Sequence, residues 1–339
     1  MSAAPRSVLA LVVSRIGDTL LGTPALRAIK ETWPDSRLTV MAHPGRLPLL
    51  AGLPWIDALV PWRPWRRWTA WLPGAARYDL AFVFHPDRRQ LDFARRSAGR
   101  VVAEAVPGVT ASERLLLPAL PDAPMVAVEQ RLRLVRAAGG DSNDQRLAYV
   151  VSADERRAAR ARLAALGVAG CHPLVALQLK SFPTKAHRDW PADSFAGLVD
   201  GLAARFPDAR FIVTGDGGSA ADATRLGERC PGRVVSLAGQ CDLRETAAVL
   251  GEMDLYIGVD TGPTHLAGAL GIPMVALYHA AYPGRYLAPR QHPRCRVIEH
   301  PRSGAADARQ ASMADIPVEA VLQAAAELLA AGGPEREAA

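Results

Sequence analysis

Short apolar segments alternate along the chain with longer segments in which apolar residues recur at helical spacing. In the first half, strands are predicted at Val8–Val13, Arg37–Met41 and Asp79–Phe84, with a helix from Leu20. The second half repeats the alternation, with strands predicted at Leu174–Leu179, Arg210–Thr214, Val234–Leu237, Leu255–Val259 and Met274–Tyr278, and helices near Ser194–Arg205, Leu243–Leu250 and from Thr264. Strands that alternate with helices form a parallel sheet with crossover helices. The pattern therefore predicts a doubly wound α/β fold.

The chain is long enough for two such domains. Its 339 residues exceed what one hydrophobic core usually organises. The segments TWPDSRLTVM (32–41) and RFPDARFIVT (205–214) share an aromatic-Pro-Asp turn between a helix and a strand, which indicates either two similar domain starts or convergent helix-stop chemistry. We predict an N-terminal domain over residues 1–155, a C-terminal domain over 156–331 and a flexible tail over 332–339.

Composition narrows the class of protein. Hydrophobic residues make up 49% and charged residues 22%, an ordinary globular mixture. The net charge of +6 favours anionic partners, but it is too small to indicate nucleic-acid binding. The first apolar run, Val8–Val13, is too short for a signal-peptide core or a membrane span. The four cysteines form no CxxC pair and have no histidine at zinc-ligand spacing, so we expect no metal site and a cytoplasmic protein.

The first candidate segment is Ser14-Arg15-Ile16-Gly17-Asp18-Thr19, which follows the first predicted strand. Ligands of open parallel sheets bind at the carboxyl ends of strands, and Gly17 allows the backbone to come close to one. At such a place, the carboxylate of Asp18 can accept a proton from a hydroxyl nucleophile. The alternative is that Asp18 or Thr19 only caps the helix.

The second candidate segment covers residues 258–265, GVDTGPTH, between another predicted strand and helix. Backbone N–H groups at a helix N-terminus, together with a Gly262 that has no Cβ, make a site suited to a diphosphate. The alternative is that Asp260 and Thr261 only cap the helix and that His265 is a satisfied, half-buried histidine.

The third candidate segment is the basic loop KSFPTKAHRDWP over residues 180–191. It holds Lys180 and Lys185, two of the three lysines in the chain. Its basic side chains and hydroxyl groups, Thr184 among them, can neutralise charge that builds up on a leaving phosphate. The alternative is a solvated loop anchored by Trp190.

Taken in order, these motifs give the chain a resemblance to glycosyltransferase family nine, the heptosyltransferases. The resemblance rests on RIGDTLLGTPALRAIK, the Trp190-Pro191 pair after a basic loop, and VDTGPTHLAGALGIPMVALY, within roughly residues 8–290. It implies a GT-B fold, in which two Rossmann-like domains with a central cleft hold the acceptor (N-terminal) and the nucleotide sugar (C-terminal). It also implies inverting, metal-independent chemistry with no cofactor.

The resemblance assigns roles to residues one by one. Asp18 matches the general base. The residues expected to bind the donor and its phosphates are Ser14, Gly17, Thr184, Lys185, Arg188, Asp260, Thr261, Gly262 and His265. The family commonly places Lys two residues before the Trp-Pro pair, where this chain has Arg188, so either Arg188 or Lys185 can contact the diphosphate. A weaker likeness puts Cys241 near the adenine and the stretch from Asp216 to Asp222 near the ribose.

The implied reaction is transfer of heptose from ADP-heptose to a saccharide or glycolipid, with the lipopolysaccharide inner core as the expected acceptor. A protein or natural-product acceptor is one alternative, and a nucleotide-sugar 2-epimerase of the same fold is another. Peripheral contact with the cytoplasmic face of the inner membrane is a further expectation. It rests on five tryptophans interspersed with arginines, Trp55, Trp62, Trp65, Trp68 and Trp71, which alternatively pack the N-terminal domain.

Overall fold

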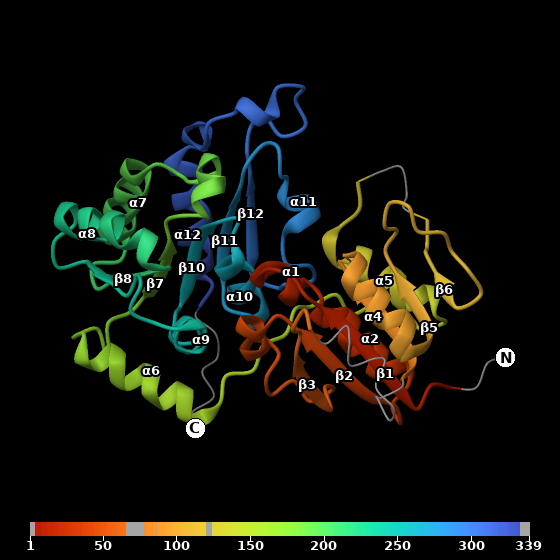
Figure 1. The fold of residues 1–339 in the computed structure, drawn as a ribbon. Helices are drawn as coiled ribbons and strands as arrows, with labels where there is room; N and C mark the ends of the chain where they lie inside the picture. Colours follow the sequence, from red (N-terminus) through yellow and green to blue (C-terminus); the bar gives the residue numbers. More distant parts are fainter. Residues whose placement is uncertain (1–3, 66–77, 86, 120–123, 333–339) are drawn as a thin grey trace. The chain divides into compact units, whose positions relative to one another are not determined.

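The chain folds into two α/β units, each built on its own six-stranded parallel sheet (Figure 1). The first unit is Met1–Val150 and the second is Val151–Ala339. The computed structural model of the chain describes residues 4–65, 78–85, 87–119 and 124–332. Both sheets are parallel throughout, as the alternation of strands and helices predicts.

The elements of the first unit alternate along the chain. Its strands are β1 (Ser7–Val12), β2 (Arg37–Ala42), β3 (Ala58–Pro61), β4 (Tyr78–Phe84), β5 (Ala98–Ala103) and β6 (Leu115–Leu116). Its helices are α1 (Ile16–Leu21), α2 (Thr23–Thr32), α4 (Arg88–Ser97) and α5 (Ala127–Ala137), with a 3-10 turn η1 (Pro44–Leu49).

The second unit has the same kind of alternation. Its strands are β7 (Leu174–Gln178), β8 (Arg210–Thr214), β9 (Val234–Ser236), β10 (Leu255–Val259), β11 (Met274–Tyr278) and β12 (Cys295–Glu299). Its helices are α6 (Ala153–Ala165), α7 (Ala192–Arg205), α8 (Ala220–Arg229), α9 (Leu243–Leu250), α10 (Gly262–Leu270), α11 (Gly284–Leu287) and α12 (Val318–Ala330). Short 3-10 turns are η2 (Pro183–Arg188), η3 (Gly217–Ser219), η4 (Ala308–Gln310) and η5 (Met313–Asp315).

Strand order is the same in the two sheets. The first sheet runs β3-β2-β1-β4-β5-β6, and the second runs β9-β8-β7-β10-β11-β12. In each unit the order reverses between the first and fourth strands, β1 and β4 or β7 and β10. Such a switch point opens a crevice at the carboxyl ends of the two strands, which is where doubly wound folds bind ligands. The topology therefore directs attention to the residues that follow these four strands.

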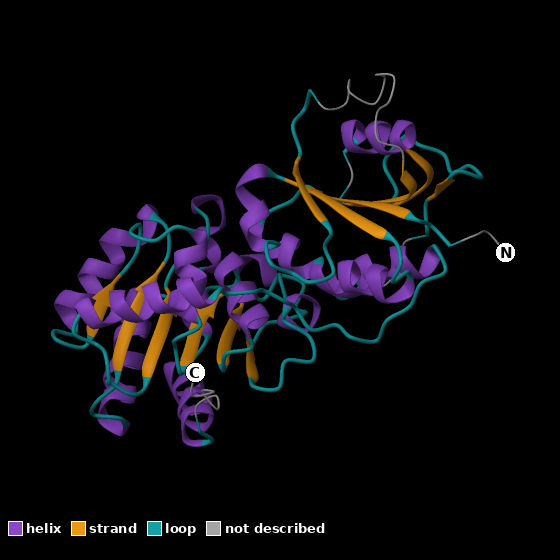
Figure 2. Cartoon of the chain, turned by 90° about the horizontal axis from the view of Figure 1, so that it is seen from below, coloured by secondary structure: helices purple, strands orange, loops and turns teal. Residues whose placement is uncertain are grey.

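Strands are buried on both faces, which explains their continuous apolar sequences. Val8 to Val12 of β1 are fully buried, and helices cover both sides of each sheet (Figure 2). In the second unit, one core cluster joins the sheet to α7, α8 and α12, with Phe195, Phe211 and Val321 among its members.

The repeated aromatic-Pro-Asp turn has the same geometry in both units. The C-cap residue of α2 is Trp33, with φ −127° and ψ 74°, and that of α7 is Phe206, with φ −129° and ψ 85°. In each turn the backbone N–H three residues later, of Ser36 or Ala209, donates to the carbonyl of the aromatic residue at 3.0 Å. The next strand then pairs beside the first strand of its unit. The two segments are thus equivalent corners of two similar domains.

Several predicted boundaries need correction. The bounds of β8, β10, β11 and α9 agree with the prediction, but the first helix begins at Ile16 rather than Leu20. Gly17 and Asp18 therefore lie inside α1 and not in a preceding loop. Part of the basic loop also folds into η2. The sequence reading did not identify α4, α5, α8 and α12.

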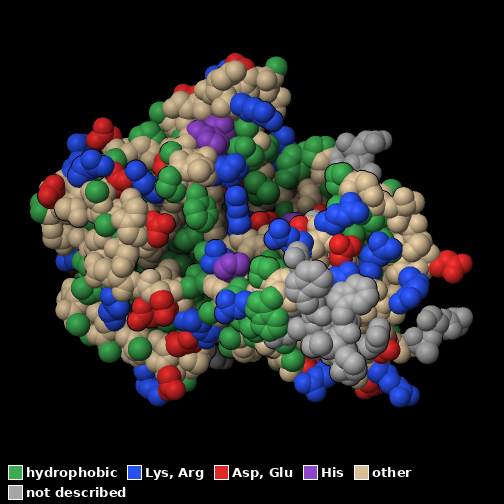
Figure 3. Space-filling model, viewed as in Figure 1, with side chains coloured by type: hydrophobic (Ala, Val, Ile, Leu, Met, Phe, Trp, Pro, Cys, Tyr) green, Lys and Arg blue, Asp and Glu red, His purple; other side chains and the backbone are tan. Residues whose placement is uncertain are grey.

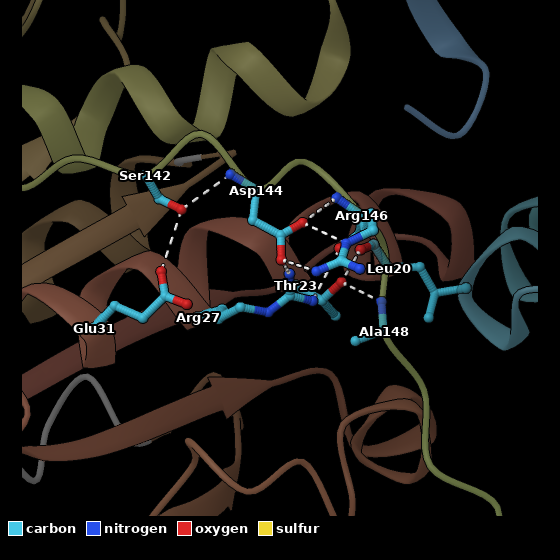
Figure 4. A network of polar contacts seen from close by, with 8 residues as sticks. All are labelled: Leu20, Thr23, Arg27, Glu31, Ser142, Asp144, Arg146 and Ala148. Carbon is cyan, nitrogen blue, oxygen red and sulfur yellow. Dashed lines mark hydrogen bonds and ion pairs between the residues drawn. The ribbon is translucent and has the colours of Figure 1, made fainter. Parts of the chain in front are cut away.

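The segment that leaves the first sheet is held against α2 (Figure 4). The Arg27 guanidinium pairs with Asp144 and donates to the Arg146 carbonyl at 3.0 Å. Thr23 Oγ1 accepts from the N–H of Ala148 at 3.0 Å. These contacts attach residues 144–148 to the first unit, and α6 of the second unit begins at Ala153. The connection between the units is correspondingly short.

The tryptophan-rich segment is described only in part. The buried Trp62 ring packs edge-on against Phe93 at 5.4 Å, and Trp55 lies under the Arg27 guanidinium at 4.9 Å. Trp65 is 58% exposed. Trp68 and Trp71 lie outside the described residues. Trp62 therefore packs inside the N-terminal domain, which is the alternative to membrane contact given above.

The close contact of β10 with β7 predicts a strict size limit at Gly258. A Cβ there would lie 2.5 Å from the Tyr256 hydroxyl oxygen and 2.8 Å from Gln178 Cβ, and both neighbours are buried. We expect Gly258→Ala to lower the free energy of unfolding by about 1–3 kcal/mol in urea unfolding. Gly227→Ala on α8 is the matched control, because its Cβ would meet only the Val234 carbonyl at 3.9 Å. Equal stability of the two variants would contradict the packing limit.

Candidate functional site

Asp18 lies in the first turn of α1, directly after β1. The helix begins at Ile16 with Arg15 as its N-cap, and no side chain caps it. Asp18 is therefore not a capping residue, and the capping alternative is wrong for Asp18 and for the buried Thr19, whose hydroxyl donates to the Arg15 carbonyl at 2.8 Å. A carboxylate in the first turn still interacts favourably with the helix dipole.

The Asp18 carboxylate is held by a buried arginine on α5. Arg131 is 1% exposed, and its Nη2 donates to Asp18 Oδ1 at 3.0 Å. The same Nη2 contacts Nε2 of His85, which follows β4 directly. His85 Nε2 lies 3.7 Å from Asp18 Oδ1. Three groups, from α1, from the residue after β4 and from α5, thus meet at the switch point of the first sheet.

His85 has an unusual backbone and an unusual side chain. Its φ of 60° lies in the left-handed region, which non-glycine residues adopt mainly where the surrounding structure enforces it. Burial and the charge of Arg131 lower the pKa of His85 to about 4. Because Arg131 can only donate, the neutral His85 ring accepts through Nε2 and carries its proton on Nδ1.

The second candidate segment follows β10 at the switch point of the second sheet. Thr261 is the N-cap of α10, and no side chain caps this helix either. Gly262 and Pro263 form its first turn, as the sequence predicts. The buried Thr264 hydroxyl bonds to the Val259 carbonyl at 2.5 Å and Tyr256 Oη at 2.9 Å. Backbone N–H groups at this N-terminus are therefore not occupied by a capping side chain, which suits an anion.

Asp260 pairs with Arg188 instead of capping the helix. Arg188 Nη1 donates to Asp260 Oδ2 at 2.6 Å, and His265 Nε2 lies 3.8 Å from Asp260 Oδ1. Both side chains of the Asp260–His265 pair are buried, so His265 is more buried than the half-buried histidine of the alternative. Each unit therefore places an Asp, an Arg and a His together at its switch point.

The basic loop is folded and anchored by Trp190, while much of it stays exposed. Asp189 Oδ1 accepts from the backbone N–H and the hydroxyl of Ser181 at 2.7 and 2.6 Å. Trp190 is buried, packs against Phe195 at 5.0 Å and donates to the Ile316 carbonyl at 3.1 Å. These contacts fix both ends of the loop, so the backbone around Arg188 is held in place.

Arg188 and Lys185 both lie against Tyr282, which follows β11. The Arg188 guanidinium carbon is 3.6 Å from the centre of the Tyr282 ring, and Lys185 Nζ is 5.7 Å from it. Lys180 instead reaches Asp222 on α8, at 2.6 Å. Thr184 is exposed beside them. The structure thus brings together two of the basic residues that the sequence singles out and separates the third.

The residues proposed for the nucleoside lie on two neighbouring loops. The N–H of Gly239, after β9, donates to the Gly215 carbonyl, after β8, at 2.9 Å. Asp216 is exposed and accepts from the Gly218 N–H at 3.0 Å. Cys241 lies two residues beyond Gly239, and partial burial raises the pKa of its thiol. The ion pair of the buried Asp222 with Lys180 directs that carboxylate toward the basic loop rather than toward Asp216.

Sequence reasoning missed three residues of this arrangement, His85, Arg131 and Tyr282. His85 follows a strand that was predicted, so the rule that selected Asp18 also selects His85. Arg131 is one of three arginines on α5, with Arg133 and Arg136, and only the fold shows which is buried.

The described parts of the chain also bear on metal binding and on membrane spans. Over those residues, no group of three or more His, Cys, Asp or Glu side chains lies together as metal ligands would. No described helix is long and apolar enough to span a bilayer. Lys and Arg side chains are spread among acidic ones over the face shown in Figure 3.

The low pKa of His85 predicts a pH-dependent stability. The unfolded chain protonates His85 near pH 6.5, and the folded chain does so only near pH 4. Its contribution to stability is therefore complete above pH 6.5 and is lost as the pH falls toward 4. His85→Asn, which tolerates a positive φ, removes this titration.

We expect urea unfolding of the wild type, relative to His85→Asn, to lose on the order of 2 kcal/mol between pH 7.5 and pH 5. Parallel pH dependences of the two proteins would show that His85 is not held neutral.

The chain is similar to known proteins in both sequence and fold. The chain is 22% identical over 300 residues to the lipopolysaccharide heptosyltransferase 3 of Escherichia coli, covering 78% of this chain and 81% of that protein. The structure of a glycosyl transferase family 9 protein from Veillonella parvula superposes with a TM-score of 0.82 at 20% identity, covering 96% and 98% of the two chains. That of the E. coli heptosyltransferase WaaC with ADP gives 0.71 at 19% identity, covering 95% and 99%.

These structural likenesses establish the GT-B fold, with its two six-stranded parallel sheets. The model of glycosyltransferase family 9 (heptosyltransferase) matches residues 117–312, which is more than half of the chain. The match includes Arg131, the basic loop and the segment after β10. The chain therefore belongs to glycosyltransferase family 9 and is a glycosyltransferase.

Proposed function

We propose that the chain catalyses inverting, metal-independent transfer of a heptose from ADP-heptose to a saccharide acceptor of the lipopolysaccharide inner core. The observation that carries the proposal is a partly exposed carboxylate, Asp18, at the switch point of the first sheet, in a chain that belongs to the heptosyltransferase family. Its donor half is supported by the uncapped N-terminus of α10 and by two basic side chains beside it.

Asp18 would act as the general base. Its side chain is 37% exposed, enough to reach an acceptor hydroxyl, while Arg131 and His85 fix its other side. Removal of the hydroxyl proton makes the oxygen a better nucleophile for the anomeric carbon of the donor. A direct displacement of this kind inverts the configuration at that carbon.

The leaving diphosphate would be stabilised by the second unit. Backbone N–H groups of Thr261 and Gly262 would meet an anion at the positive end of α10. Arg188, with Lys185 beside it, supplies positive charge where the negative charge develops. Thr184 and Thr261 add hydroxyl groups, and Asp216 and Cys241 lie on loops that could border the nucleoside. In the first unit, Ser14 and Gly17 lie close to Asp18 after β1 and are proposed as donor-binding residues.

The acceptor and the setting are part of the same proposal. The E. coli relative is a lipopolysaccharide heptosyltransferase, and WaaC was solved with ADP. The proposal adopts the same acceptor class and donor for this chain. Since nucleotide sugars are made in the cytoplasm, the enzyme would work there, with the exposed Trp65 available to meet the inner membrane.

Replacing Asp18 tests the base. We expect Asp18→Asn to lower kcat for transfer from ADP-heptose to heptose-deficient inner-core lipopolysaccharide by about 10²–10⁴-fold, and to leave ADP binding nearly unchanged. Mass spectrometry of the product and the rate of ADP release give the measurement. Asp193→Asn, an exposed carboxylate on α7, is the control. Near-normal turnover of Asp18→Asn would rule out the base, and conversion of the nucleotide sugar to its C2 epimer without any acceptor would favour an epimerase.

Nucleotide preference tests the donor. A ligand that binds only the folded state raises its stability by an amount set by concentration and affinity. We expect ADP to raise the Tm of the wild type more than UDP or GDP does, and Arg188→Ala to lose most of that increase. A larger increase with UDP or GDP would contradict an ADP-linked donor.

A further inference from the structure

Tyr282 presents the face of its ring to Arg188, the cation on which the proposed donor site depends. The Arg188 guanidinium carbon lies 3.6 Å from the centre of that ring, well within the range of a cation–π contact. Tyr282 belongs to the loop after β11, the strand next to β10 and therefore next to Asp260. No motif in the sequence marks it.

The remaining contacts of Arg188 show what the ring does. Nη1 is bonded to Asp260 at 2.6 Å, and Nε is buried without a hydrogen-bond partner among the described residues. Its side chain is 14% exposed. A buried donor that lacks an acceptor is costly, and a phosphate oxygen is an acceptor that would satisfy it. Asp260 fixes one edge of the guanidinium and Tyr282 covers one face, so its remaining donors are restricted to one direction.

Tyr282 also serves the second cation. Lys185 Nζ lies 5.7 Å from the same ring. The pKa of the Tyr282 phenol is lowered, first by a side-chain hydrogen bond with Arg188 and further by the charges of Lys185 and Arg188. Two cations that would otherwise repel each other thus share one aromatic ring. Arg188 and Lys185 can then both contribute positive charge to the diphosphate site.

We propose that Tyr282 is the positioning residue of the donor diphosphate site, holding the planar guanidinium of Arg188 against Asp260 and keeping Lys185 beside it. This inference rests on the proposed function, because it assigns the diphosphate to Arg188. It also explains why an arginine suits this position: a guanidinium stacks flat on an aromatic ring and still offers in-plane donors, and an ammonium cannot do both.

Calorimetric titration of ADP into the full-length chain and its variants tests the proposal. We expect Tyr282→Ala and Tyr282→Leu to weaken ADP binding roughly ten-fold, and Tyr282→Phe, which keeps the ring face, to bind nearly as the wild type does. The matched control is Tyr286→Ala, because Tyr286 lies four residues further on and its ring faces Arg285. Tyr282→Leu keeps an apolar side chain at the position, so it separates loss of the ring face from loss of packing.

A second measurement separates positioning from general structural support. Arg188→Lys should weaken ADP binding strongly in the wild type and much less in Tyr282→Ala, because the stacking that it disrupts is already gone. The KM for the donor should rise in Tyr282→Ala with the KM for the acceptor unchanged.

The outcomes are distinguishable. A wild type that binds none of ADP, UDP and GDP overturns the proposed function and this inference with it. If the wild type binds ADP no better than Tyr282→Ala and Tyr282→Leu, this inference alone is overturned. Loss of binding in Tyr282→Phe equal to that in Tyr282→Ala also overturns it, since the hydroxyl and not the ring would then be responsible. Additive effects of Arg188→Lys and Tyr282→Ala on ADP binding likewise overturn this inference.

Discussion

The need to neutralise a buried arginine organises both halves of this molecule. A guanidinium taken out of water is tolerated only beside a carboxylate and other acceptors. Arg131 in the first unit and Arg188 in the second meet this need with Asp18 and Asp260, each in the segment that follows a strand at the switch point. Without its carboxylate, each guanidinium would lose its charged partner, so each pair constrains the position of its strand end and of the helix after it.

The two pairs are alike in composition and unlike in exposure, and the difference separates the roles proposed for them. In the first unit the arginine is the buried partner, and the Asp18 side chain is 37% exposed. In the second unit Asp260 is the more buried partner at 6%, and Arg188 is the group beside the helix N-terminus. One arrangement presents a negative group and the other a positive group. Base chemistry and phosphate binding need these opposite charges.

The sequence was sufficient for the fold because the physical signals for it are local. Strands buried on both faces are continuous apolar runs, and β8, β10 and β11 could be bounded to the residue. Asp18 and Asp260 could be found because each follows such a run. Arg131 could not, because three arginines on α5 look alike until packing turns one inward. Tyr282 could not, because its partner Arg188 is far from it in the chain and only the order of β10 and β11 brings them together.

The contacts of residues 144–148 with α2 matter for anyone who wishes to produce the first unit by itself. Arg27 and Thr23 receive their partners from this segment, after the last helix of the unit has ended at Ala137. A fragment that stops soon after that helix would leave the Arg27 guanidinium without Asp144 and would expose the side of α2 that the segment covers. The recombinant fragment should therefore extend to Val150, where the compact unit ends.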